Sequence, residues 1–130
     1  MPDNTADRKK ILVVEDNDFV RMQIIRFLDE AGYAVIETKD GHTALASMNA
    51  DIAMAIVDVR MEPIDGFEFI RAIRARDMHT PVILVTGDHN PDLLNEAGKW
   101  GVAAVLMKPV QRDRLVKTVT RTLQSQERAS

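Results

Sequence analysis

Hydrophobic residues along the chain gather into five short runs that are separated by longer stretches of mixed character. The runs contain three to six residues each, and valine and isoleucine are frequent among them. This length and composition are typical of strands that are buried on both faces of a sheet. The predicted strands are 11–14, 34–36, 52–57, 82–85 and 102–107.

The stretches between these runs place apolar residues at helical spacing. In the first of them, Val20, Ile24 and Phe27 fall on one side of a helix, and later stretches repeat the arrangement. Five alternations of strand and helix predict an α/β fold, a doubly wound five-stranded parallel sheet with helices on both faces. We expect one domain over 9–125, with flexible tails at 1–8 and 126–130.

Composition narrows the possible partners and compartments. A length of 130 residues suits one domain, and the net charge of −3 argues against direct binding to nucleic acid or an anionic membrane. The longest apolar runs have six residues and are too short to span a bilayer. The chain contains no cysteine, which excludes disulfides and thiolate metal sites and fits a cytoplasmic location.

Polar side chains follow four of the five predicted strands. Glu15 and Asp16 follow the first, Asp58 the third, Thr86 the fourth and Lys108 the fifth. Ligands of open parallel sheets bind beyond the carboxyl ends of the strands. Three carboxylates, a hydroxyl and an ammonium group are therefore expected at one edge, and the second strand adds nothing comparable.

Adjacent acids at the end of a buried strand repel each other and need a cation. An oxygen-rich site without cysteine or histidine suits Mg²⁺, or Mn²⁺ in its place. Taken singly, Glu15 is as well explained as a solvated loop residue, Thr86 as a helix N-cap and Lys108 as a surface lysine. Their common position at one edge favours a metal site.

Four segments in a fixed order carry a family resemblance. "VVEDN", "DVRMEPIDG", "TG" and "KP" resemble the motifs of the receiver domain of two-component response regulators, and the likeness covers roughly residues 9 to 125. It implies the flavodoxin-like (βα)5 fold with strand order 2-1-3-4-5, similar to a stand-alone chemotaxis regulator. It also implies a histidine kinase or histidine phosphotransfer protein as phosphoryl donor, an unidentified protein target, and a monomer or weak dimer.

The resemblance also implies roles for the acidic residues. Asp58 is similar to the phospho-accepting aspartate of the family. Glu15 and Asp16 resemble the acid pair that helps to hold Mg²⁺, with Asp58 and the backbone carbonyl of Arg60 as further ligands.

The remaining motif residues match groups that handle the phosphoryl group. Thr86 resembles the switch hydroxyl, and Lys108 resembles the lysine that pairs with phosphoryl oxygens. Pro109 resembles a proline whose preceding peptide bond is usually cis in the family. Gly87 has no side chain and is expected to leave the approach to Asp58 open.

The chain departs from the family pattern at two positions and carries a charged pair near the expected site. Val105 stands where the family often has an aromatic switch residue, and Glu62, followed by Pro63, replaces a common proline. Arg60 and Asp88 are expected to flank the mouth of the site with opposite charges and to slow dephosphorylation. The alternative is that both side chains point into solvent.

Three functional classes are compatible with these residues. The favoured one is a phosphorylation-activated switch, which is no enzyme beyond its own phosphorylation and dephosphorylation at Asp58. A degenerate receiver that acts as a phosphorylation-independent binding module is the alternative, because Val105 replaces the aromatic residue. An aspartate-nucleophile phosphatase is disfavoured, because haloacid-dehalogenase-like enzymes carry a second aspartate where this chain has Arg60.

Overall fold

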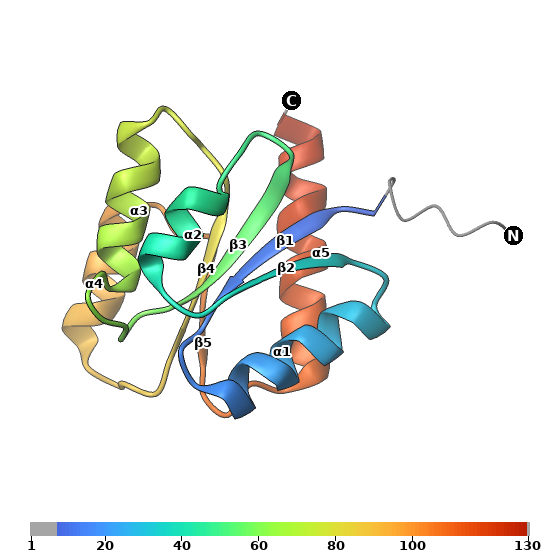
Figure 1. Ribbon diagram of the computed structural model, residues 1–130, viewed down its shortest axis with the longest axis horizontal. Coiled ribbons are helices and arrows are strands. Elements are labelled where there is room, and N and C mark those ends of the chain that lie inside the picture. The colour runs from blue at the N-terminus through green and yellow to red at the C-terminus, as the bar shows by residue number, and fades with distance from the viewer. Residues whose placement is uncertain (1–7, 130) are drawn as a thin grey trace, which may run out of the picture.

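The computed structural model describes residues 8–129, in which five strands alternate with five helices (Figure 1). This confirms the predicted α/β fold, and the predicted strand ends differ from the observed ones by at most two residues. The strands are β1 (Lys10–Val14), β2 (Ala34–Thr38), β3 (Ile52–Asp58), β4 (Val82–Thr86) and β5 (Ala104–Met107). The helices are α1 (Asp18–Glu30), α2 (Gly41–Ser47), α3 (Gly66–Ala75), α4 (Pro91–Lys99) and α5 (Arg112–Ala129).

All five strands pair in parallel, in the order β2-β1-β3-β4-β5. This is the order that the family resemblance implied. The register places Asp58 opposite Val85 on β4, and Thr86 opposite Met107 on β5. The carboxyl ends of the central strands therefore meet at one edge, which is where the polar residues of the sequence motifs lie.

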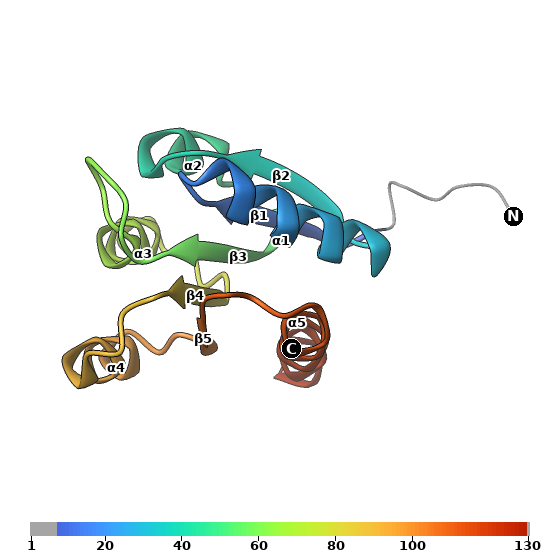
Figure 2. The same cartoon turned by 90° about the horizontal axis from the view of Figure 1, so that it is seen from below.

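The helices cover both faces of the sheet and divide the hydrophobic core in two. Figure 2 shows α2, α3 and α4 on one side and α1 and α5 on the other. Phe69 and Leu84 belong to the first core, whereas Ile24 and Leu115 belong to the second. Because the central strands are covered on both faces, their side chains are almost all apolar, and the sequence shows continuous apolar runs instead of alternation.

Helix α3 begins directly beside the end of β3. Asp65 caps the helix by accepting a hydrogen bond from the backbone N–H of Glu68, whose side chain accepts one from the backbone N–H of Asp65 in return. Gly66 is packed so closely that a Cβ atom there would lie 2.8 Å from the carbonyl oxygen of Asp58. The start of α3 thus supports the backbone of the predicted phospho-acceptor.

Trp100, the only tryptophan of the sequence, is the C-cap residue of helix α4. Its indole Nε1 donates a hydrogen bond of 3.2 Å to Glu96 Oε1, and the half-buried ring packs against the core under α2, α3 and α4. Val105 of β5 packs against the same core. Trp100 and Val105 therefore both pack on the core at this face of the sheet.

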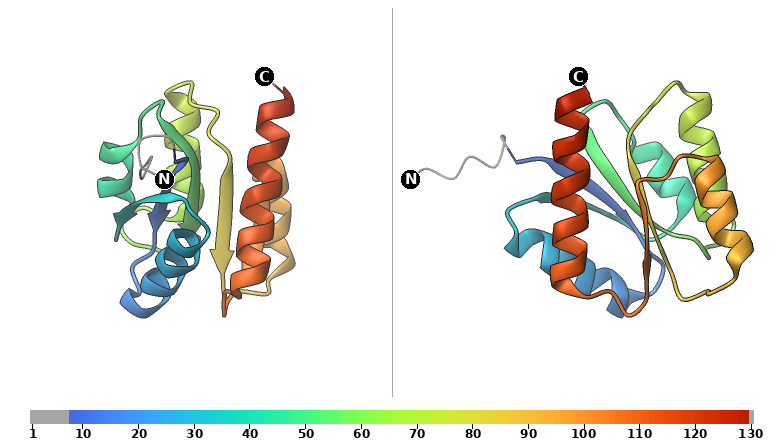
Figure 3. Two further views of the ribbon diagram at one scale, coloured as in Figure 1. Left: turned by 90° about the vertical axis from the view of Figure 1, so that its right-hand side faces the viewer. Right: turned by 180° about the vertical axis from the view of Figure 1, so that it is seen from behind.

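Helix α5 continues to Ala129, beyond residue 125 where the sequence predicted a tail (Figure 3). The apolar stripe ends at Leu123, but the following Gln, Glu, Arg and Ala residues are good helix formers and extend the helix without a buried face. The predicted tail over 1–8 lies outside the described residues except for Arg8. No helix within 8–129 is long and apolar enough to cross a membrane.

Candidate functional site

Three carboxylates meet at the carboxyl edge of the sheet. One oxygen from each of Glu15, Asp16 and Asp58 lies within 4.8 Å of the others. Glu15 and Asp16 follow β1, and Asp58 is the last residue of β3. Glu15 and Asp58 are buried, whereas Asp16 is exposed. The structure thus brings together the acids that the sequence analysis assigned to one site.

Lys108 reaches the same cluster from the loop after β5. Its Nζ lies 3.0 Å from Glu15 Oε1 and 3.5 Å from Asp58 Oδ1. Its backbone N–H donates a hydrogen bond of 2.8 Å to the carbonyl oxygen of Thr86, which ties this loop to the end of β4. The peptide bond between Lys108 and Pro109 is cis, as the resemblance implied.

Burial dominates the electrostatics of the two inner acids. It raises the pKa of Glu15 to about 7, although the backbone N–H of Asn17 and the ammonium of Lys108 both act in the opposite direction. Burial also raises the pKa of Asp58, and Lys108 again opposes the shift. For Lys108 itself burial lowers the pKa, but the two carboxylates outweigh it and the net direction is upward. A single ammonium therefore does not compensate the cluster.

The residues fit a hard divalent cation. Glu15 Oε1 is buried and accepts no well-formed hydrogen bond from the residues that the structure describes, so its contact with Lys108 is an ion pair of poor hydrogen-bond geometry. An ionised buried oxygen in this position is costly unless a cation contacts it. Clustered carboxylate oxygens are the ligands that Mg²⁺ and Mn²⁺ take in proteins. That the carbonyl of Arg60 completes the set stays a prediction.

Arg60 and Asp88 form an ion pair beside Asp58 and Thr86. The guanidinium of Arg60 forms a close ion pair with the Asp88 carboxylate, and its hydrogen bond holds the pKa of Asp88 below the ordinary value. The backbone N–H of Arg60 donates to Asp58 Oδ1 at 3.2 Å, and that of Asp88 donates to Thr86 Oγ1 at 3.0 Å. The pair expected from the sequence therefore exists and links the loops after β3 and β4.

The other predicted site residues take different positions around the cluster. Thr86 is buried at the end of β4, next to the strand that carries Asp58. Gly87 is exposed, and a Cβ atom added to it would contact nothing within 4 Å. That Gly87 leaves the approach to Asp58 open stays a prediction. Val105 is half-buried and packs against the core under α2, α3 and α4.

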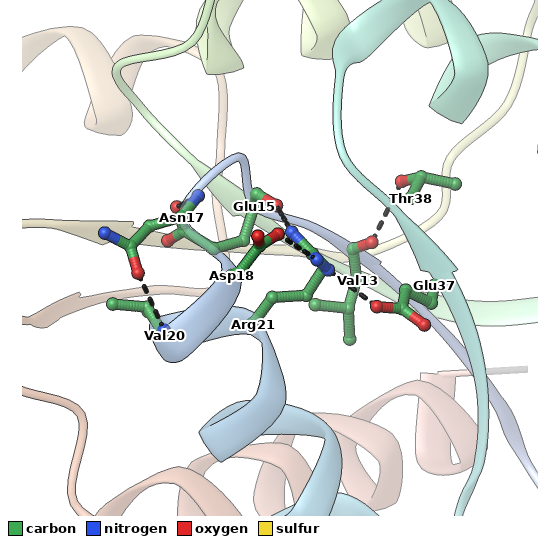
Figure 4. Close-up of polar contacts among 8 residues, drawn as sticks. All are labelled: Val13, Glu15, Asn17, Asp18, Val20, Arg21, Glu37 and Thr38. Carbon is green, nitrogen blue, oxygen red and sulfur yellow. Dashed lines mark hydrogen bonds and ion pairs between the residues drawn. The ribbon is translucent and has the colours of Figure 1, made fainter.

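Three supporting residues, Arg21, Glu37 and Thr38, were missed by the sequence analysis, which assigned no role to the second strand. Arg21 of α1 is buried and donates to the carbonyl oxygen of Glu15, and its Nε donates to Glu37 of β2 (Figure 4). Thr38 of β2 accepts the backbone N–H of Glu15 on its carbonyl at 3.2 Å. The signal in the sequence was an arginine on the apolar stripe of a predicted helix, in line with Ile24.

Comparison with known proteins agrees with this site. A model of the response regulator receiver domain matches residues 11–120, which is most of the chain. The chain therefore belongs to the receiver domain family of response regulators. Receiver domains of this family are switches of two-component phosphorylation signalling.

Solved structures share the fold over nearly the full length. The chemotaxis response regulator CheY4 of Vibrio cholerae is 33% identical with a TM-score of 0.79, over 88% of this chain and 98% of that one. A CheY-like receiver domain from Methanospirillum hungatei has a TM-score of 0.88 at 23% identity, over 95% and 100% of the two chains, and supports the fold.

Curated relatives are longer proteins. The CAI-1 autoinducer sensor kinase/phosphatase CqsS of Vibrio cholerae is 32% identical over 85% of this chain, which spans 17% of that protein. The transcriptional regulatory protein FixJ of Bradyrhizobium diazoefficiens is 29% identical over 92% of this chain, which spans 59% of that protein.

Proposed function

We propose that this chain is a phosphorylation-activated signalling switch that accepts a phosphoryl group on Asp58. The donor in this proposal is a phosphohistidine on a histidine kinase or a histidine phosphotransfer protein. The observation that carries the proposal is the cluster of Glu15, Asp16 and Asp58 within 4.8 Å, with Lys108 against it. A single acid at a strand end that is solvated would not need two further carboxylates and a lysine beside it.

The reaction follows from the positions of these groups. A carboxylate oxygen of Asp58 attacks phosphorus, the P–N bond of the phosphohistidine breaks, and the imidazole nitrogen keeps the electron pair. Lys108 pairs with a phosphoryl oxygen in this proposal, which the 3.5 Å distance from its Nζ to Asp58 Oδ1 supports. Glu15, Asp16 and Asp58 would hold Mg²⁺ or Mn²⁺, which supplies positive charge against the phosphoryl oxygens when bound.

The output of the switch is a protein–protein contact in this proposal. Phosphorylation shifts the population between conformers, and a difference of a few kcal/mol suffices, on the order of the 5.5 kcal/mol that reverses a 1:99 ratio. The target is a protein, the chain is a monomer or weak dimer, and the location is cytoplasmic, which the cysteine-free composition supports.

Incubation with acetyl phosphate and Mg²⁺, followed by intact mass measurement, tests the proposal. We expect one added phosphoryl group on the wild type, and none on Asp58→Asn or in the presence of EDTA. Label that persists in Asp58→Asn would refute the assignment of Asp58. Absence of an adduct on the wild type would favour the phosphorylation-independent binding module, and steady phosphate release from many phosphate esters would favour a phosphatase.

A further inference from the structure

Arg21 is a buried charged residue that makes no contact with the carboxyl groups of the cluster. Its side chain is only 5% exposed, and it shares its side of α1 with Ile24 and Leu28. A buried guanidinium is costly unless its donors are matched by acceptors. The partners of Arg21 therefore indicate why an arginine occupies this position.

Three different nitrogen atoms of Arg21 donate hydrogen bonds to three different residues (Figure 4). Nη1 donates to the carbonyl oxygen of Glu15 at 2.9 Å, in the loop between β1 and α1. Nε donates to Glu37 Oε2 on β2 at 2.6 Å, and Nη2 donates to Asp18 Oδ1 at the start of α1 at 2.5 Å. The planar fork of arginine suits this arrangement, whereas lysine has a single nitrogen and cannot reach three acceptors that are spread in this way.

The bond to the Glu15 carbonyl fixes the peptide unit between Glu15 and Asp16. That carbonyl and the amide nitrogen of Asp16 belong to one planar group, so its orientation determines where both side chains leave the backbone. The backbone N–H of Glu15 is held by Thr38, and Oε2 of Glu15 accepts the backbone N–H of Asn17 at 3.1 Å. Among these restraints, Arg21 supplies the one on the carbonyl side.

We propose that Arg21, braced by Glu37, is a positioning residue that holds the Glu15–Asp16 peptide in the orientation needed for metal binding. The inference rests on the proposed function, because it concerns the same metal site. The positive charge of Arg21 and its positioning of the peptide have opposite effects on Mg²⁺ affinity, so an experiment can tell them apart. A cation near the site repels Mg²⁺, so removal of its charge alone would strengthen metal binding, whereas loss of positioning weakens it.

Mg²⁺ titration of the purified full chain by calorimetry tests the inference, with Arg21→Met, Arg21→Lys and Glu37→Gln as variants. The matched control is Arg26→Met, an identical change at an exposed position of the same helix. We expect Arg21→Met and Arg21→Lys to bind Mg²⁺ roughly 10-fold more weakly, the low end for loss of a group that orients a metal ligand. Glu37→Gln should weaken binding less, and Arg26→Met should match the wild type.

Amide hydrogen exchange of the metal-free protein gives an independent measurement. Residues 15–18 should exchange faster in Arg21→Lys than in the wild type, while β3 keeps its protection, which shows that the variant is folded. Unchanged or tighter Mg²⁺ binding by Arg21→Lys and Arg21→Met, with unchanged exchange at 15–18, would overturn the inference. If the wild type itself bound no Mg²⁺, the proposed function would fail, and the exchange data would still decide whether Arg21 holds the loop.

Discussion

At the scale of single residues, Glu15 has the most perturbed ionisation in the site. Its pKa rises from the ordinary 4.5 to about 7 because the carboxyl group is buried. A carboxyl whose pKa is higher in the folded than in the unfolded protein binds its proton more tightly in the folded state. The protonated group therefore adds stability below about pH 4.5, and this contribution is lost as the pH rises through about 7.

We predict that the metal-free protein loses stability between about pH 4.5 and about pH 7. Urea unfolding at several pH values measures this loss, and Glu15→Gln should show a shallower decline, since only Asp58 then contributes with the same sign. Mg²⁺ should add more stability at the higher pH, because protons no longer compete for the carboxylates. Glu30→Gln, an exposed change, is the control, and a decline that is identical in Glu15→Gln would contradict the explanation.

The pair of Arg60 and Asp88 affects the lifetime of the phosphorylated state in our interpretation. An ion pair with one largely exposed partner contributes little to stability, and we infer that the pair acts by restricting the water that attacks an aspartyl phosphate at Asp58. We predict that replacing both residues with alanine speeds dephosphorylation several-fold, and that either single change produces most of the effect. Decay of phosphorylated protein followed by intact mass checks this, and equal rates in all variants would exclude the pair from the mechanism.

At the scale of secondary-structure elements, the contact between α3 and β3 admits no side chain at Gly66. An added Cβ would lie 2.8 Å from the Asp58 carbonyl oxygen and 3.0 Å from the Val59 Cα, and both are backbone atoms that cannot turn aside. We predict that Gly66→Ala destabilises the protein by about 1–3 kcal/mol, the usual range for overpacking, and slows phosphorylation of Asp58.

Gly98 in α4 provides the matched comparison for Gly66. A Cβ at this position would contact nothing within 4 Å, so Gly98→Ala should be neutral or stabilise the protein by up to about 1 kcal/mol through helix propensity. Urea denaturation of both variants gives the two values. Equal stabilities for the two alanine variants would show that α3 can move away from Asp58 without cost.

The loops after β3 and β5 are each tied to the end of β4 by a backbone hydrogen bond, which provides a route for the switch without an aromatic residue at Val105. Val59 N–H donates to the Val85 carbonyl at 3.0 Å, and Lys108 N–H donates to the Thr86 carbonyl at 2.8 Å. We predict that a phosphoryl mimic such as beryllofluoride changes amide exchange over residues 86–110 as well as 58–66. Changes confined to 58–66 would show that the site is not coupled to β5.

At the scale of the whole molecule, the fold was predictable because its signal is repeated. Five apolar runs and five amphipathic stretches each point to the same layered sheet, and a wrong bound of two residues changes nothing in the topology. The motif acids were predictable because parallel strands deliver their last residues to one edge. The full length of α5 was not, because beyond Leu123 it has no buried face to mark it.

The support for the site was harder to predict, because it depends on contacts between distant parts of the chain. Arg21 and Glu37 are 16 positions apart and meet only because β2 lies beside β1, with Glu37 opposite Val13. Nothing local in the sequence marks Glu37 as different from a solvated strand residue. The role of a buried polar residue depends on its hydrogen-bond partners, and only the three-dimensional structure identifies them.

The position of Trp100 gives the protein an optical reporter of its own. The indole is half-buried at the junction of α4 and β5, and its emission wavelength depends on how much water reaches the ring and on the hydrogen bond from Nε1 to Glu96. Because the sequence contains no second tryptophan, the whole indole signal comes from this junction. Rapid mixing of the unlabelled protein with Mg²⁺ and beryllofluoride should therefore change the Trp100 fluorescence over time. The rate of that change is the rate at which binding at the acidic cluster alters the structure at the end of α4.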